Sequence, residues 1–124
     1  MFELSITPIH GAAAGYDQHG AAGGSAANTM VGVALTGGTA CYIGKVGNDA
    51  AGALYRHSMA EAGVEFEVEA NAGPTGTCLV LVTPDGERTM QTSLGSSASL
   101  LESDISPERI AQSRILYVEG YLWG

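Results

Sequence analysis

The hydrophobic period changes along this chain, and that change constrains the fold more than any other feature of the sequence. Apolar residues recur at helical spacing in two segments after Gly23, of which the first ends at Gly37-Gly38 and the second at Gly63. Residues 64–69 instead alternate between apolar side chains and glutamates, which is typical of a strand with one solvated face. The order of these patterns predicts an α/β fold with an antiparallel excursion in its middle.

The first half of the chain predicts a helix, a strand and a second helix. Ser25 is a candidate N-cap, and Gly32 within the first helix costs about 1 kcal/mol relative to alanine, which suggests close packing against a sheet. Residues 39–43 predict a short buried strand, and Asp49 is placed to cap the second helix. Before Gly23 we expect one short strand around residues 2–6 and otherwise loop.

The second half predicts a hairpin, a short helix and a final strand. Residues 77–83 and 88–93 flank Pro84-Asp85-Gly86-Glu87, in which proline sets the first turn position and glycine supplies a positive φ. Ser106-Pro107 predicts a helix start. The continuous apolar run at residues 115–118 is typical of a parallel strand buried on both faces.

Composition narrows the class of protein. The 124 residues suffice for one domain, and 45% hydrophobic residues argue against a disordered chain. Five basic residues against thirteen acidic ones give a net charge of −8, which excludes a basic groove for nucleic acid. No apolar run approaches the roughly 18–20 residues that span a bilayer. With two cysteines and no signal-peptide pattern, we expect a reduced, cytoplasmic protein.

The spacing of the candidate residues excludes several known catalytic and metal-binding motifs. Gly38 and Gly44 enclose five residues where a P-loop needs four, and Lys45 is followed by valine. No dinucleotide fingerprint or serine-hydrolase elbow is present. The three histidines have no ligand spacing with one another or with a cysteine, so we expect no metal site; they are His10, His19 and His57.

The segment Gly23-Gly24-Ser25-Ala26-Ala27-Asn28 is the strongest candidate for binding chemistry. Two glycines allow a ligand to approach the backbone, and the helix that follows offers unpaired N–H donors. The Asn28 amide both donates and accepts, which suits vicinal hydroxyls of a sugar. The alternative is a tight turn in which Asn28 bonds locally to the backbone.

These residues resemble the N-terminal signature of the ribokinase-like, or PfkB, carbohydrate kinases, and the resemblance covers residues 23–124 in order. The matching motifs are GGSAAN at 23–28, GG at 37–38, GKVGND at 44–49 with Gly52, TGTC at 75–78, and DGERTM at 85–90. The segment EGYLW at 119–123 resembles the adenosine-kinase-like branch.

The resemblance implies a Rossmann-like α/β core and a small β lid that closes over the substrate. It also implies transfer of the ATP γ-phosphoryl group, with Mg²⁺, to a hydroxymethyl group of a sugar or nucleoside. Substrate binding would fall to Gly23, Gly24, Ser25 and Asn28. Cys78 would lie near the base or sugar, although a buried core thiol is the alternative for that residue.

The sequence also departs from the family pattern. Asp17 follows no apolar run, so it is not assigned the role of the family's sugar-binding aspartate. The catalytic Gly-Ala-Gly-Asp motif has no counterpart, so no residue here is expected to be catalytic. We therefore predict a substrate-binding portion that is inactive alone and binds ATP and Mg²⁺ weakly. The alternative is a non-catalytic sugar- or nucleoside-binding module, or a decayed remnant.

The expected organisation is an irregular segment at residues 1–22 and a partial α/β domain at residues 23–124. Strands between residues 64 and 93 would form the lid. Self-association through the lid or an exposed sheet edge is the expected route to a homo-oligomer. Beyond a small-molecule substrate, we expect neither nucleic acid nor a membrane as partner.

Overall fold

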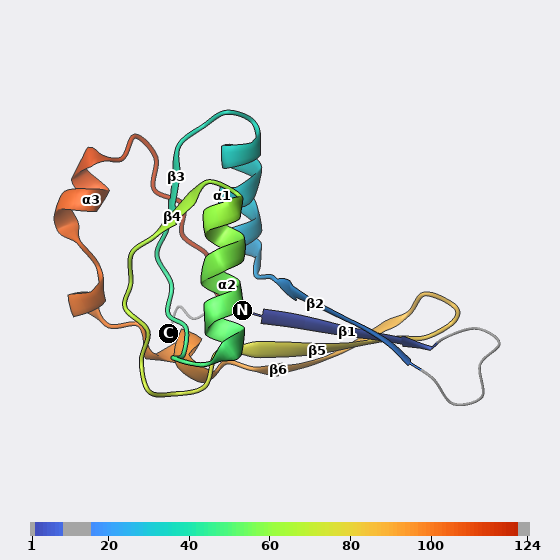
Figure 1. Ribbon diagram of the computed structural model, residues 1–124. Helices are drawn as coiled ribbons and strands as arrows, with labels where there is room; N and C mark the ends of the chain where they lie inside the picture. The colour runs from blue at the N-terminus through green and yellow to red at the C-terminus, as the bar shows by residue number, and fades with distance from the viewer. Residues whose placement is uncertain (1, 9–15, 122–124) are drawn as a thin grey trace.

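The chain folds around two separate sheets in a computed structural model that describes residues 2–8 and 16–121, with side chains from His19 onward. The strands are β1 (Phe2–Pro8), β2 (Tyr16–Ala22), β3 (Ala40–Tyr42), β4 (Val64–Phe66), β5 (Thr77–Val82) and β6 (Arg88–Ser93). The helices are α1 (Ser25–Leu35), α2 (Ala50–Glu61) and α3 (Pro107–Gln112), with 3-10 turns at Gly95–Ser99 and Glu102–Asp104. The four-stranded sheet extends away from the helices, and β3 and β4 lie between α3 and the α1–α2 pair (Figure 1).

The larger sheet has the strand order β2-β1-β5-β6. The predicted hairpin is confirmed: β5 and β6 pair antiparallel, and Gly86 in their turn has a φ of 86°. The expectation of loop beyond residue 6 is wrong for β2, which pairs antiparallel with β1 across its whole length. The sequence of β2 shows no alternation of apolar and polar residues, so no strand was predicted there. It can still pair with β1, because a strand ladder is built from backbone groups that every residue carries. The boundary at residue 22, between the first segment and the α/β domain, stays a prediction.

The smaller sheet pairs β3 with β4 in parallel, and one of its faces is covered by α1 and α2. The expectation that residues 64–68 join the antiparallel layer is therefore wrong. Parallel pairing follows from the β3–α2–β4 connection, since a helical crossover returns the chain in the same direction. The buried core lies here and comprises Ala27, Ala40, Val46, Tyr55, Met59 and Val64.

Helix starts were predictable only in part. Asp49 caps α2 by accepting from Gly52 N at 2.8 Å, and the Ser106 hydroxyl caps α3 by accepting from Arg109 N, as predicted. The prediction for α1 is wrong, because Gly24 is its N-cap and no side chain caps it. Gly32 does not pack closely either, since a Cβ there would have nothing within 4 Å.

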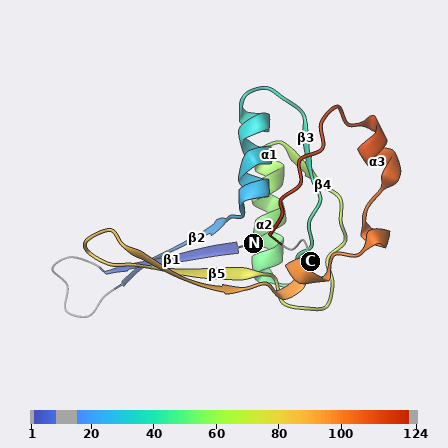
Figure 2. The same ribbon diagram turned by 180° about the vertical axis from the view of Figure 1, so that it is seen from behind.

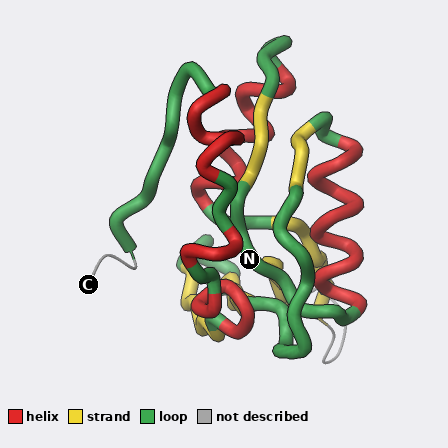
Figure 3. Tube along the Cα trace, turned by 90° about the vertical axis from the view of Figure 1, so that its left-hand side faces the viewer, coloured by secondary structure: helices red, strands yellow, loops and turns green. Residues whose placement is uncertain are grey.

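The predicted strand at residues 115–118 is also wrong. This segment forms no strand, and its exposed fractions range from 49% at Tyr117 to 85% at Ile115. Figures 2 and 3 show it running from α3 toward the C-terminus outside both sheets. A central parallel strand is buried only when strands flank it and helices cover both faces. Within the described residues, nothing supplies that surrounding structure.

Candidate functional site

The di-glycine at the start of α1 is held from two sides. Gly24 has a φ of 104° and a ψ of 131°, a conformation that favours glycine. Its carbonyl accepts the first helical bond, from Asn28 N at 2.9 Å. The carbonyl of buried Gly23 accepts a hydrogen bond from the Tyr55 hydroxyl of α2 at 3.2 Å. Because no side chain caps α1, its first N–H groups are candidates for ligand donors.

Asn28 lies one turn into α1 with an exposed side chain. It borders a cavity of about 350 Å³ between β2, α1 and α2. Ser58 of α2 also lines this cavity. The remaining lining is small or apolar and comprises Gly20, Ala21, Ala22, Ala27, Val31, Met59 and Ala62.

The predicted site residues divide into two groups. Gly23, Gly24, Ser25 and Asn28 lie together at the start of α1, with Ser25 as an exposed first helical residue. Cys78 lies instead on β5, where it is 1% exposed and its Sγ accepts a hydrogen bond from Thr92 Oγ1 at 3.5 Å. It does not border the cavity beside Asn28. Its ligand role, like that of the di-glycine, stays a prediction. The side chain of Asp17 lies outside the described ones.

A cluster around Asp49 and Thr75 joins two loops and the start of α2. Asp49 Oδ2 accepts from Thr75 N at 2.8 Å, and Asp49 Oδ1 accepts from Thr75 Oγ1 at 2.6 Å. Thr75 Oγ1 in turn accepts from Gly47 N at 2.9 Å. These hydrogen bonds from Thr75 and Gly52 lower the pKa of Asp49. The cluster fixes the loop before β5 to the start of α2.

A second polar group ties the end of β6 to the same loop. Asn71 Oδ1 accepts from Gly73 N at 3.0 Å and from Ser96 Oγ at 2.6 Å, and Asn71 Nδ2 donates to Ser99 Oγ at 2.7 Å. Both ends of the β5–β6 hairpin are therefore anchored. The Asp49 cap was predictable from the sequence, whereas the contacts of Thr75, noted only within the TGTC motif, and of Asn71 were not, because their partners are distant in sequence.

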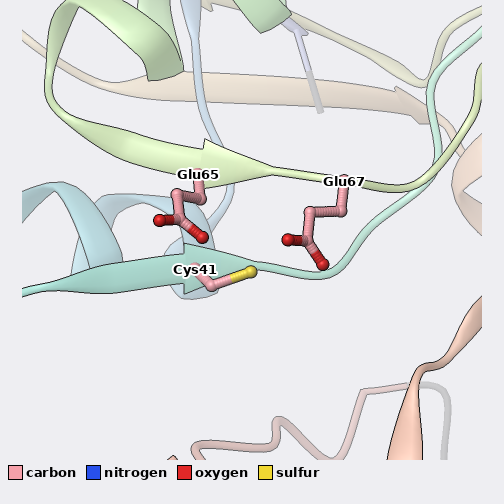
Figure 4. A group of neighbouring side chains, drawn as sticks. All are labelled: Cys41, Glu65 and Glu67. Carbon is pink, nitrogen blue, oxygen red and sulfur yellow. The ribbon is translucent and has the colours of Figure 1, made fainter. Parts of the chain in front are cut away.

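The open face of the smaller sheet carries a cysteine and two glutamates. Figure 4 shows the carboxylates of Glu65 and Glu67 extending toward β3, where Cys41 lies, and one ligand atom from each lies within 4.8 Å of the others. Arg109 of α3 already forms ion pairs with both glutamates. Desolvation raises the pKa of Cys41, which favours the protonated thiol. The cluster is therefore an ion-pair contact between α3 and β4, and it is a poor cation site.

The other chemistry-bearing residues are engaged elsewhere. Lys45 pairs with Asp104, so the loop after β3 does not present a free ammonium group. His57 is exposed and lies 3.4 Å from Glu61, one turn along α2. His19 is in β2, and His10 lies outside the described residues.

Comparison with known proteins places the chain in a family. Residues 12–123 match the pfkB family carbohydrate kinase profile. A fructokinase from Klebsiella pneumoniae is 40% identical over 81 residues, which cover 63% of this chain and 26% of that protein. The crystal structure of adenosine kinase from Sinorhizobium meliloti superposes with a TM-score of 0.83 at 31% identity, covering 99% of this chain and 45% of that one.

A fructokinase from Xylella fastidiosa with bound ATP shares the fold, with a TM-score of 0.79 at 23% identity over 90% of this chain and 36% of that one. The fold and the motifs together are those of the ribokinase-like class of proteins. This chain belongs to the pfkB carbohydrate kinase family. It spans about a quarter of the fructokinase and less than half of the adenosine kinase. Among the described helices, none has the length and apolar character needed to cross a bilayer.

Proposed function

We propose that this chain is the substrate-binding portion of an ATP-dependent kinase for a sugar or a nucleoside. The observation that carries the proposal is the start of α1, where the di-glycine, uncapped N–H donors and Asn28 lie together and Asn28 borders a cavity. These groups suit the hydroxyls of a polyol, which both donate and accept hydrogen bonds. The similarity to fructokinases and to an adenosine kinase supports this substrate class.

The described residues do not fit ATP and Mg²⁺. A nucleoside triphosphate is commonly held by cations, but Lys45 and Arg109 already hold carboxylates, Arg56 donates to a backbone carbonyl, and the chain carries a net charge of −8. The negative charges of Glu65 on β4 and of Glu67 just after it are compensated by Arg109. We therefore assign neither the phosphoryl donor nor the metal to residues of this chain.

The Asn28→Ala variant is expected to bind the cognate sugar or nucleoside about 1–3 kcal/mol more weakly, because it removes a polar partner of the bound ligand. Titration calorimetry with D-fructose, D-ribose and adenosine measures this loss. Thr29→Ala is the matched control, since Thr29 lies beside Asn28 on α1 but bonds only locally, to the Ser25 carbonyl at 2.8 Å. A loss of thermal stability with unchanged ligand affinity would instead support a purely local role for Asn28.

The 124-residue chain alone is expected to transfer no phosphoryl group. Transfer needs a base for the substrate hydroxyl, an anion-stabilising loop and bound Mg²⁺, and none of these is assigned to the described residues. A coupled assay for ADP release, with the three probes above, tests this. Release above a blank that depends on the probe, from a preparation free of host kinases, would contradict the expectation. Ligand binding without transfer, even after the remaining kinase segments are supplied, would favour a non-catalytic binding module.

We also propose that the four-stranded sheet, which carries the predicted lid strands β5 and β6, offers a contact for a second copy of the chain. Strand β6 is a sheet edge, and all six of its residues are exposed. An edge strand has unpaired backbone groups that can pair with another strand. A cytoplasmic location is proposed as well, supported by two free cysteines.

A further inference from the structure

The Tyr55 hydroxyl is a buried polar group whose bond reaches the candidate ligand site. Tyr55 is 0% exposed, and its ring packs against both Tyr42 and Phe66 at centroid distances of 6.2 and 5.9 Å. The hydroxyl donates to the carbonyl of Gly23, 32 positions away in the sequence. Since a buried hydroxyl without a partner is costly, the ring packing and this hydrogen bond together fix the position of the Gly23 carbonyl.

Fixing that carbonyl also orients the N–H of Gly24. The peptide bond between Gly23 and Gly24 is planar and trans, so its C=O and N–H point in opposite directions. With the carbonyl held toward Tyr55 in the core, the Gly24 N–H points away from the core. The Gly24 carbonyl is held in turn by Asn28 N. Both carbonyls of the di-glycine are therefore anchored.

The hydrogen bond persists over the physiological pH range. Desolvation raises the pKa of Tyr55 far above its usual range, so the phenol stays protonated and remains a donor. The partner carbonyl does not titrate. The orientation of the peptide group is therefore independent of pH near neutrality.

We propose that Tyr55 is a positioning residue for ligand binding: it presents the Gly24 N–H to a hydroxyl of the sugar or nucleoside. This inference rests on the proposed function, because it assumes that the ligand lies at the start of α1. Tyr55 does not touch the ligand, and it acts through the peptide group that it holds. The bound ligand is thereby offered a pre-oriented donor, which reduces the entropy lost on binding.

The test compares Tyr55→Phe with Tyr42→Phe. Both changes remove one phenolic oxygen from the same aromatic cluster, but only the Tyr55 hydroxyl bonds the Gly23 carbonyl directly. The Tyr42 hydroxyl interacts with the Tyr55 hydroxyl, so Tyr42→Phe is expected to have a smaller effect of the same sign. Tyr55→Phe is expected to raise the Kd for the bound probe, among D-fructose, D-ribose and adenosine, about three- to tenfold. In NMR spectra without ligand, it is also expected to shift the Gly24 amide resonance more than Tyr42→Phe does.

A second measurement needs no variant and covers the case in which Tyr55→Phe fails to fold. Titrating the wild-type chain with the bound probe is expected to shift the Gly24 amide resonance together with that of Asn28. An unshifted Gly24 amide at saturation overturns the inference, as does a folded Tyr55→Phe variant with wild-type Kd. If the wild-type chain binds none of the three probes, the proposed function fails, and the role of Tyr55 fails with it.

Discussion

Replacing Gly52 by alanine is expected to destabilise the fold by about 2–4 kcal/mol, although alanine is the better helix former. Gly52 lies in the first turn of α2, where a Cβ would come within 2.1 Å of the Gly47 carbonyl oxygen and 2.8 Å of Thr75 Oγ1. The oxygen of Gly47 belongs to the backbone and cannot rotate away. The loop after β3 would have to move, and the hydrogen bonds around Asp49 would be lost. Thermal unfolding should show a fall in Tm of about 10 °C.

The Gly32→Ala variant is the matched control because it makes the same change within a helix. Gly32 is exposed on α1, and a Cβ added there would meet nothing within 4 Å, so alanine should stabilise by about 0.5–1 kcal/mol. The two variants are therefore expected to move Tm in opposite directions. Equal shifts would show that the contact between the start of α2 and the loop after β3 is looser than described.

Replacing Thr75 by valine is expected to cost about 2–3 kcal/mol of unfolding free energy at neutral pH. Valine keeps the shape of the side chain but removes the hydroxyl that donates to Asp49 and accepts from Gly47 N. Thr75 is buried, so the Gly47 N–H would lose its partner away from water. Thr75→Ser keeps the hydroxyl and loses one methyl group, so we expect a loss of only about 1 kcal/mol from this control.

The Thr75→Val variant should also change how the unfolding free energy depends on pH. The pKa of Asp49 is lowered in the folded state, chiefly by the Thr75 side chain and then by backbone bonds from Thr75 and Gly52. Its contribution is therefore present above the unfolded pKa of about 3.9 and is lost as pH falls through the folded pKa. Without the Thr75 hydroxyl the folded pKa rises toward the unfolded value. Urea unfolding at pH 7 and below pH 4 should show that the difference in unfolding free energy between wild type and Thr75→Val becomes smaller at the lower pH.

These two predictions concern the framework that holds the β5–β6 hairpin against α2. Gly47, Gly52 and Thr75 join the loop after β3, the start of α2 and the loop that leads into β5. Asn71 and Ser96 add the end of β6 to the same framework. Because the β5–β6 hairpin is anchored at both ends, the position of its strands relative to α2 depends on these short contacts.

Features that depend on neighbours along the chain were predictable from sequence. The helices α1 and α2, the β5–β6 hairpin and the caps Asp49 and Ser106 follow from periodicity, turn residues and capping geometry, each of which acts over a few residues. The di-glycine and Asn28 were found in the same way, since they are contiguous in sequence. The resemblance to the pfkB family rested on the same local motifs.

Only the tertiary structure decided which distant segments meet. The parallel pairing of β4 with β3, the entry of β2 into the larger sheet and the bond from Tyr55 to Gly23 depend on backbone groups, which leave no residue-specific pattern in a sequence. The apolar run at residues 115–118 is the opposite case, in which a local pattern predicted an element that the tertiary structure does not contain. Its composition suits a buried strand, but burial requires flanking strands and covering helices, and within the described residues it has neither.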